Sequence, residues 1–416
     1  MKLRDIGIES MADVLFVHDH VFRRGNDGGV YSSGCFPSSV WSRYLAAFSS
    51  LTVLARCAAD PLTHEEQGLF PLSSADKVAF VFSQSASNLT SLLGLHNAAR
   101  VTVREQVARH DAVIARLSSE LGLLAIREAV EQGKPWAVEL VDCPWDSYWN
   151  YGGMKAKLYA PLMAARVRRV MRRSTHALYV TKEFLQRRYP CSGEATTAAC
   201  SNVEIPPLDA AVLRKREGVA GGAAERLVLG QIASLKGRFK GIQTVMEALA
   251  IVRAEFPSVE YHILGGGEKE PWIEEARRWG VEELCHFDGV LPSGPAVYQW
   301  LDSVDVYVHP SFKEGLPRAL IEAMSRGCPA VASTVAGTPE LLPEDSMIRP
   351  GDAKGLARKI QDLGRDRERQ VSEGRRNFYI AGEYTTDKLS LERAKFWNQF
   401  RRVVESTDAQ RGQRGG

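Results

Sequence analysis

Two glutamates flank a short turn in the second half of the chain. Glu314 and Glu322 are separated by seven residues within the segment EGLPRALIE. The β-branched run VDVYVHP before them predicts a strand, so Glu314 is expected in the loop after that strand's carboxyl end, where open α/β sheets bind ligands. The run RALIEAMSRG predicts a helix that follows the Gly-Leu-Pro turn and ends at Gly327. The free N–H groups of its first turn suit a phosphate or a sugar hydroxyl.

The spacing of the two acids limits what they can do together. Eight residues at a rise of about 1.5 Å place Glu322 about 12 Å along the helix. Two carboxylates so far apart do not share one proton, and they would instead contact the two ends of one ligand. A nucleotide sugar has this form, with a hydroxylated sugar at one end and a ribose at the other. The alternative is that Glu322 lies on a solvated helix face and Glu314 is an ordinary loop acid.

The segment EGLPRALIEAMSRGCPAVAS resembles the signature of glycosyltransferase family 4. The resemblance implies a retaining enzyme of the GT-B architecture, with two Rossmann-like domains facing across a cleft and a C-terminal helix that returns to the N-terminal domain. It also implies a nucleotide-sugar donor as substrate and no metal or other cofactor. By position, Glu314 is the acid beside the donor sugar and Glu322 the acid that binds the ribose. The turn Gly315, Leu316 and Pro317 is expected to contact the donor as well.

A basic loop follows the predicted strand RLVLGQIAS. The loop LKGRFKG holds three cations and two glycines, and such residues would neutralise a diphosphate and let backbone approach it. Lys240 and Gly241 match a Lys-Gly pair of family 4. The companion arginine of the family is replaced by Gln231, and Arg238 is the expected substitute. The alternative is a basic surface loop without a ligand.

Two further segments of the second half resemble donor contacts of the family. The turn ILGGGEKE resembles a glycine-rich turn near the nucleotide, which assigns Gly265 and Gly266 to the donor site. The segment HFDGVL resembles a strand and loop beside the base, so Val290 is a predicted neighbour of the base. Asp305 is expected to be structural and not part of a metal-binding Asp-x-Asp motif.

The first half offers candidates for the acceptor side. Gly28 and Gly29 follow the predicted first strand ADVLFVHDH and resemble glycines that lie against donor and acceptor in the family. His18 ends that strand and is also assigned to the acceptor side. With Asp19 and His20 it forms a polar cluster, but no further ligand at a suitable spacing accompanies them, so no metal site is predicted.

The segment VELVDCPWDSYWN carries the predicted acceptor-facing acid. Family 4 often has a histidine here, whereas this chain resembles a branch of bacterial capsule and surface-polysaccharide enzymes. Asp142, at the end of the predicted strand, is the preferred catalytic candidate and Asp146 an acceptor-side candidate. The alternative is that Asp146 caps a turn while Trp145 and Trp149 pack. Arg116 would reach an anionic group of the acceptor or cap a helix.

Length and patterning predict two domains of the α/β class. Near-continuous apolar strands that alternate with helices indicate parallel sheets covered on both faces, and 416 residues exceed one usual core. The predicted divisions are an acceptor-binding domain at 1–205, a donor-binding domain at 206–388, a returning helix at 389–405 and a disordered tail at 406–416.

Composition excludes several classes of protein. A net charge of +3 does not indicate nucleic-acid binding. The seven cysteines are scattered, which indicates neither a disulfide framework nor a zinc site. The first residues contain acids and no apolar signal segment, and no run is long enough to span a membrane, so a cytoplasmic protein is expected. The basic stretch 155–188 is either a solvated helix face or a peripheral contact with the inner face of the membrane.

These features together predict a hexosyl- or N-acetylhexosaminyltransferase of surface polysaccharide biosynthesis. UDP-sugars are the first choice of donor and GDP-sugars the second, on family frequency. The acceptor would be a hydroxyl of a glycan, a lipid-linked sugar or a small molecule. The alternatives are a non-catalytic nucleotide-sugar-binding subunit and a nucleotide-sugar epimerase. No G-x-G-x-x-G with a following acid opens either half, which argues against a dehydrogenase.

Overall fold

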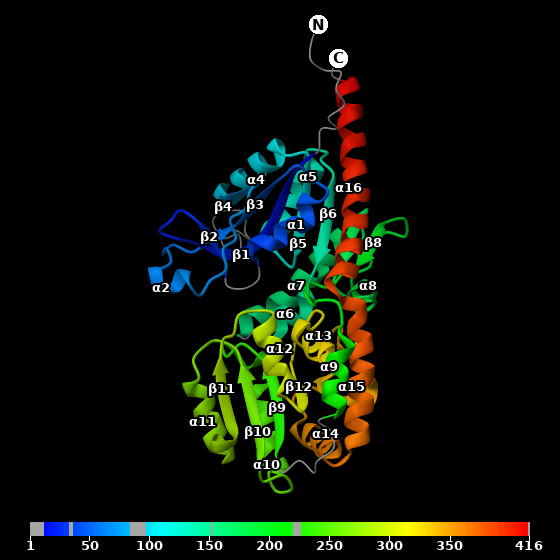
Figure 1. Ribbon diagram of the computed structural model, residues 1–416. Helices are drawn as coiled ribbons and strands as arrows, with labels where there is room; N and C mark the ends of the chain where they lie inside the picture. The colour runs from blue at the N-terminus through cyan, green and yellow to red at the C-terminus, as the bar shows by residue number, and fades with distance from the viewer. Residues whose placement is uncertain (1–11, 33–35, 84–96, 151–152, 219–225, 415–416) are drawn as a thin grey trace.

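The computed structural model describes residues 12–32, 36–83, 97–150, 153–218 and 226–414. They form two lobes, one from each half of the chain, and each lobe has its own β-sheet with helices around it (Figure 1). One end of each sheet faces the other lobe (Figure 1). Two domains of the α/β class, predicted from the alternation of strands and helices, are confirmed.

The sheet of the first domain has the order β4-β3-β1-β5-β6-β7-β8, with neighbouring strands parallel, and β2 pairs antiparallel with β1. Its strands are β1 (Asp13–Arg24), β2 (Val30–Tyr31), β3 (Ser50–Cys57), β4 (Val78–Phe82), β5 (Ala112–Leu117), β6 (Trp136–Leu140), β7 (His176–Tyr179) and β8 (Thr196–Ala199). Its helices are α1 (Ser42–Leu45), α2 (His64–Gln67), α4 (Asn97–Arg109), α5 (Glu120–Glu131), α6 (Pro144–Asn150), α7 (Met154–Met171) and α8 (Phe184–Arg188).

Strand β1 shows why the buried part of a central strand is apolar at successive positions. Leu15 and Val17 belong to a core cluster with α4 and α5, while the alternating Val14 and Phe16 belong to a second cluster on the other face. Successive side chains of a strand point to opposite faces, so a sheet covered on both sides needs apolar residues at every position.

The sheet of the second domain has the order β11-β10-β9-β12-β13-β14, and every pair is parallel. Its strands are β9 (Leu227–Ile232), β10 (Val259–Leu264), β11 (Cys285–Gly289), β12 (Val306–His309), β13 (Ala330–Ser333) and β14 (Met347–Ile348). Its helices are α9 (Ala210–Gly218), α10 (Ile242–Val252), α11 (Glu270–Trp279), α12 (Pro295–Asp302), α13 (Arg318–Ser325), α14 (Ala353–Arg365) and α15 (Arg367–Ala381). The site is built at the carboxyl ends of these strands.

The chain passes between the lobes twice, and the two passages lie side by side. Ile205 forms a parallel bridge with Thr385, and the N–H of Thr386 donates to the carbonyl of Ile205 at 2.8 Å. These residues stand next to the predicted divisions at 205/206 and 388/389.

The last helix, α16 (Thr386–Arg414), returns to the first domain as predicted. Trp397 is buried against Tyr44 and Phe48, with ring centroids 5.5 and 6.4 Å away. The prediction of a disordered tail at 406–416 was wrong as far as Arg414. Once a helix is nucleated, each added residue gains a hydrogen bond at little cost, so α16 continues past its packed part.

No helix within the described ranges is both long and apolar enough to cross a bilayer.

Candidate active site

The carboxylate of Glu314 lies where two loops of the second domain meet. Its Oε1 atom accepts hydrogen bonds from Lys240 Nζ at 2.6 Å and from His309 Nε2 at 2.9 Å. His309 is the buried last residue of β12. From the described residues, Oε2 of Glu314 accepts no hydrogen bond. One carboxylate oxygen is therefore fixed by the protein, and the other can accept from a ligand.

The charge state of Glu314 follows from its neighbours. Burial by itself would raise the pKa of Glu314, but the charge of Lys240 and the contact with His309 outweigh burial and hold this pKa well below its ordinary value. Glu314 therefore stays ionised throughout the physiological pH range. An ionised carboxylate accepts hydrogen bonds from sugar hydroxyls but cannot supply a proton.

A glycine allows the two loops to meet. Gly241 has φ of +75°, and a Cβ atom there would lie 2.0 Å from the carbonyl oxygen of Pro310. The N–H of Phe312 also donates to the carbonyl of Phe239 at 2.7 Å, which joins the same two loops. Any larger residue at 241 would push Lys240 away from Glu314. The predicted Lys-Gly pair thus stands beside the predicted acid.

Glu322 projects from α13 near the same cluster. Burial raises the pKa of Glu322, and the charge of Arg318 only partly opposes this. From the described residues its carboxylate accepts no hydrogen bond. Glu314 and Glu322 both raise the pKa of Tyr307, after the larger effect of burial, so its hydroxyl lies within electrostatic reach of both acids. The structure therefore brings the two predicted glutamates to one region.

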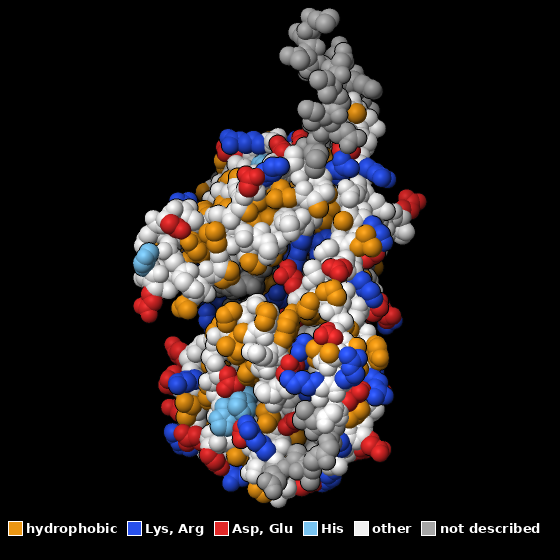
Figure 2. All heavy atoms as spheres, in the orientation of Figure 1, with side chains coloured by type: hydrophobic (Ala, Val, Ile, Leu, Met, Phe, Trp, Pro, Cys, Tyr) orange, Lys and Arg blue, Asp and Glu red, His pale blue; other side chains and the backbone are white. Residues whose placement is uncertain are grey.

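The turn between the two glutamates touches the first domain. A Cβ atom at Gly315 would lie 2.2 Å from the carbonyl oxygen of Val141, which directly follows β6. Leu316 is buried, and Pro317 is the N-cap residue of α13. The two predicted glutamates thus stand at the boundary of the lobes, where the space-filling view shows a hollow (Figure 2).

The predicted base-contacting segments lie at the ends of β10 and β11. The N–H of Gly265 donates to the carbonyl of Gly289 at 2.7 Å, and a Cβ atom at Gly265 would overlap the carbonyl of Ala233. A Cβ atom at Gly266 would lie 3.0 Å from Val290, whose side chain is 73% exposed. These residues are therefore neighbours at the edge where the site is built.

Arg238 is not joined to the cluster of Lys240 and Glu314. Its guanidinium donates to Glu275 at 3.2 and 3.3 Å, lies over the ring of Trp272 and is 61% exposed. A different cation, Lys313, lies within electrostatic reach of Glu314. Lys313 lies 4.7 Å from the ring centroid of Phe239, and burial lowers its pKa.

Asp142 lies at the carboxyl end of β6 and faces this second cation. Its carboxylate accepts from the N–H and hydroxyl of Ser118 and from the hydroxyl of Ser147 at 2.7 to 3.2 Å. Its negative charge acts on Lys313, as does that of Glu314. Three hydrogen bonds therefore fix the orientation of Asp142, the preferred acceptor-side candidate. Asp142 lies on the first domain, across from Lys240 and Glu314.

Asp146 has a structural environment. Its carboxylate pairs with Arg188 at 3.3 Å, and its carbonyl accepts from Asn150, whose amide also donates to the carbonyl of Phe312 in the second domain. Trp145 and Trp149 stack with centroids 5.6 Å apart. The Asp146 carboxylate therefore has a protein partner, and the two tryptophans pack on each other.

His18 and Arg116 are also held by other protein groups. His18 Nδ1 lies 3.1 Å from the carbonyl oxygen of Arg116, and burial together with the charge of Arg116 lowers the pKa of His18 to about 3. Arg116 pairs with the buried Glu139 at 3.3 Å. Arg116 neither caps a helix nor extends freely toward a ligand. Asp19 accepts a hydrogen bond from the first N–H of α5, and His20 contacts Ser32. The side chains of His18, Asp19 and His20 thus have separate protein partners and do not converge on one point.

Gly28 and Gly29 form the turn between β1 and β2. Gly28 has φ of +78°, and the N–H of Gly29 donates to Asp27 at 3.0 Å. The turn is thus the tip of a hairpin, which explains the two glycines by local geometry.

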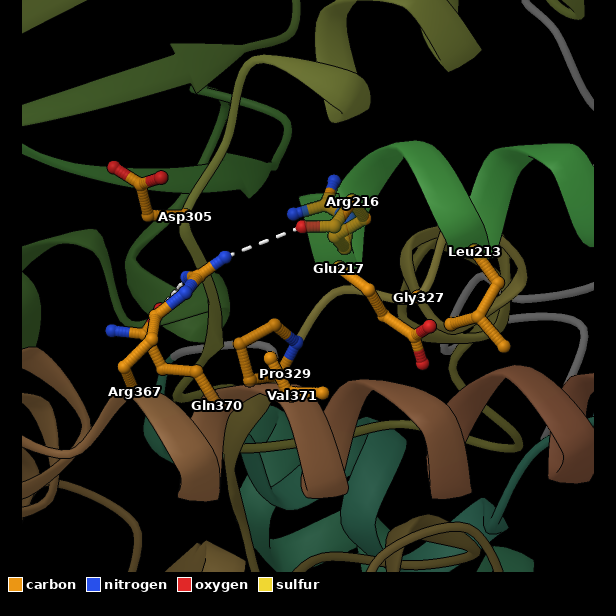
Figure 3. A pocket seen from close by; sticks show the side chains of 9 residues that line it. All are labelled: Leu213, Arg216, Glu217, Asp305, Gly327, Pro329, Arg367, Gln370 and Val371. Carbon is orange, nitrogen blue, oxygen red and sulfur yellow. Dashed lines mark hydrogen bonds between the residues drawn. The ribbon is translucent and has the colours of Figure 1, made fainter. Parts of the chain in front are cut away.

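Figure 3 shows a pocket on the second domain that Lys240, Glu314 and Glu322 do not line. It is lined by α9, α15 and Asp305, at the amino end of β12. Asp305 accepts from the N–H of Val228 at 2.8 Å, and Arg367 donates to the carbonyl of Arg216. The structural role predicted for Asp305 is confirmed. Ligands of open α/β sheets bind at the opposite edge.

Comparison with known proteins assigns the second domain. Residues 226–366 match the family model described as glycosyl transferases group 1, and this range includes Lys240, Glu314 and Glu322. It is a group 1 glycosyltransferase domain. The chain is accordingly a glycosyltransferase, as the resemblance predicted.

Two curated relatives extend the assignment of the group 1 domain. Protein CapJ of Staphylococcus aureus is 27% identical over 395 residues, which cover 94% of this chain and 96% of CapJ. The putative colanic acid biosynthesis glycosyltransferase WcaL of Salmonella typhimurium is 32% identical over 139 residues, but these cover only 30% of this chain and 33% of WcaL.

Solved structures show the fold around the group 1 domain. Sucrose-phosphate synthase of Thermosynechococcus elongatus superposes with a TM-score of 0.67 at 16% identity, over 94% of this chain and 100% of that one. HepE of Anabaena, in complex with UDP-glucose, superposes with a TM-score of 0.61 at 18% identity, over 95% and 100%. The predicted GT-B fold is confirmed.

Sequence reasoning missed two side chains at the site of the group 1 domain. His309 could have been found as a polar residue that ends an apolar strand. Lys313 precedes Glu314 in sequence, but only the fold brings it to Asp142 of the first domain.

Proposed function

We propose that the chain transfers a sugar from a nucleotide sugar to an acceptor hydroxyl with retention of configuration. The observation that carries the proposal is the pairing of Lys240 with an ionised Glu314 whose second oxygen accepts no bond from the described protein. Lys240 would bind the donor diphosphate, Glu314 the sugar hydroxyls and Glu322 the ribose hydroxyls.

The proposed reaction needs charge stabilisation more than a protein acid. The bond between the anomeric carbon and the phosphate oxygen breaks, and the acceptor oxygen bonds to the same face of that carbon. The leaving phosphate takes the acceptor's proton, because the depressed pKa of Glu314 makes its carboxylate a weak base. Lys240 and Lys313 would offset the charge that develops on this phosphate. Asp142 would orient the acceptor hydroxyl, and closure of the lobes would exclude water.

UDP-sugars remain the first choice of donor and GDP-sugars the second. The solved complex of HepE with UDP-glucose supports the first choice. The name of WcaL, a putative colanic acid biosynthesis enzyme, supports an acceptor in surface polysaccharide synthesis. We expect the transfer itself to need no metal.

The donor assignment is tested by following nucleotide release from UDP-, GDP- and dTDP-sugars with the purified chain. Release of UDP alone, abolished by Lys240→Ala and retained by Lys354→Ala, is the expected result. Lys354 is an exposed lysine in the first turn of α14 and serves as a matched control. Binding of a UDP-sugar without turnover under any acceptor condition would favour a non-catalytic subunit, and conversion of the sugar without an acceptor would favour an epimerase.

The proposal includes a peripheral contact of α7 with an anionic membrane. Met154 and Leu158 are 73% and 72% exposed on one side of α7, and Lys155 and Lys157 lie beside them. Exposed apolar side chains with neighbouring cations fit a lipid surface. Sedimentation with vesicles that contain phosphatidylglycerol should therefore exceed sedimentation with neutral vesicles. The double variant Met154→Ser with Leu158→Ser should lose this binding, whereas Leu69→Ser, at an exposed leucine elsewhere, should not.

A further inference from the structure

The outer two strands of the second sheet carry a polar cluster on one face. Val259, Tyr261 and Ile263 of β10 are buried in the core, so the alternating Glu260 and His262 face the other way. On the edge strand β11, His286 stands directly beside His262 in the strand register. The fold therefore brings His286 of β11 to Glu260 and His262, which are neighbours on one face of β10.

The cluster forms a histidine patch on the surface of the second lobe (Figure 2). The two imidazole rings stack with centroids 4.6 Å apart. His262 Nε2 lies 3.1 Å and His286 Nε2 3.8 Å from Glu260 Oε2, and one ligand atom from each residue lies within 4.8 Å of the others. The patch is half-buried, and in Figure 2 it lies away from the hollow between the lobes.

These separations suit a tetrahedral metal ion. Zinc binds histidine nitrogen and carboxylate oxygen at about 2.0–2.1 Å, so neighbouring ligand atoms around a tetrahedral ion lie about 3.3 Å apart. The two distances to Glu260 Oε2 lie on either side of this value. Glu260 Oε2 also accepts a hydrogen bond from Arg226, which the ion would replace.

A fourth residue fixes the orientation of His262. Asp288 Oδ2 lies 3.0 Å from His262 Nδ1 and accepts from Trp300 Nε1 at 2.6 Å. Both ring nitrogens of His262 thus face carboxylates, but a neutral imidazole has only one N–H. If Nδ1–H donates to Asp288, the lone pair of Nε2 faces the carboxylate of Glu260. Two lone pairs repel each other, so a cation or a proton between Nε2 and Glu260 would stabilise the arrangement. Zinc-binding histidines commonly have a carboxylate on the other ring nitrogen in this way.

We propose that Glu260, His262 and His286 bind one Zn²⁺ ion, with Asp288 holding His262 in the required orientation. Three protein ligands leave a fourth position for water. The ion would link the edge strand β11 to β10, and these strands end at Leu264 and Gly289, directly before Gly265 and Val290. The site is separate from Lys240 and Glu314, so the proposal does not depend on the transfer reaction.

The test is a titration of the metal-free, tag-free protein with ZnCl₂, followed by calorimetry and thermal unfolding. One equivalent should bind, and at about 100 times the dissociation constant the Tm should rise by about 5 °C or more. His262→Ala and His286→Ala should each weaken binding more than 10-fold, and Asp288→Asn by about 10-fold to 100-fold. His64→Ala, which removes an exposed histidine of the first domain, should bind as the wild type does.

Two outcomes would overturn the proposal. One is stoichiometric zinc binding that survives both His262→Ala and His286→Ala, and the other is no binding above the level of the doubly substituted protein. Far-ultraviolet circular dichroism of each variant without metal separates loss of the site from loss of the fold. Cobalt(II) gives a second measurement, since a tetrahedral site produces intense visible absorption that the variants should lack.

Discussion

The two domains hold their predicted functional residues in different ways. In the second domain Lys240, Glu314 and Glu322 come from two loops and a helix at one sheet edge, and two of them bond each other. In the first domain, Arg116 is paired with Glu139 and Asp146 with Arg188. A charged residue is thus weak evidence of function when its partner lies outside the proposed site. Asp142 is the first-domain candidate that faces the other lobe's charges.

The largest expected effect separates the two cations of the donor loop. Lys240→Ala should lower kcat by about 100-fold or more, because it removes a charge placed where the leaving phosphate develops its own. Arg238→Ala should change kcat by less than about 10-fold, because Arg238 bonds Glu275 instead. Steady-state kinetics with a saturating donor compares them. Equal losses in both variants would return Arg238 to the donor site.

The next effect concerns stability and the first domain. Arg116→Met should lower the free energy of unfolding by about 3–5 kcal/mol, because it leaves the buried Glu139 without its cation. Urea denaturation measures this change. The donor KM of the remaining folded enzyme should stay within about twofold of the wild type. A stable variant with a large rise in acceptor KM would instead give Arg116 the predicted role at the acceptor.

Asp142→Asn should change the reaction with the acceptor without changing hydrolysis of the donor. Loss of the negative charge should raise the acceptor KM by about 10-fold, the equivalent of one charged hydrogen bond, and leave donor hydrolysis unchanged. The two rates are measured in parallel, with and without acceptor. Unchanged acceptor kinetics would remove the first domain's remaining candidate acid.

Glu322→Gln should weaken binding of the donor and slightly stabilise the fold. The donor KM should rise by about 10-fold at pH 7, because a neutral amide accepts weaker bonds from the ribose. At the same pH the Tm should rise slightly. The pKa of Glu322 is raised in the folded protein, so ionisation as the pH rises above about 4.5 costs folding free energy, and the amide avoids this cost. A lower Tm would show that the carboxylate has a stabilising partner.

Opposite pKa shifts give the two glutamates different responses to acid. The pKa of Glu314 is depressed, so its contribution to stability is present above about pH 4.5 and is lost only as pH falls toward the folded value. The pKa of Glu322 is raised, so Glu322 takes up a proton first. Donor KM measured from pH 7.5 to 5 should therefore rise in the wild type and stay flatter in Glu322→Gln.

Much of the fold and of the donor side could be predicted from the sequence because the signals are local. The strands β9 and β12 are largely apolar runs, β10 alternates apolar with polar residues, and Glu314, Gly315 and Glu322 lie within one short motif. The strands β7 and β8 were not predicted, since four residues such as His176–Tyr179 or Thr196–Ala199 give too short a pattern.

What the sequence could not give depends on contacts between distant residues. The pairing of Arg238 with Glu275 and the approach of Lys313 to Asp142 join separate elements. The histidine patch is of the same kind, because only the register of β10 and β11 places His262 beside His286. Continuation of α16 to Arg414 depends on a helix already formed against the first domain.

The bridge between Ile205 and Thr385 limits how the lobes can move. A single connecting segment would allow one lobe to twist, tilt and slide against the other. Two segments bonded side by side resist twisting, so the main freedom left is rotation about an axis through them. The entrance of the active site would then widen and narrow as the two domains rotate about a hinge at this bridge. Substitutions at this pair would change the angle of opening without touching either substrate.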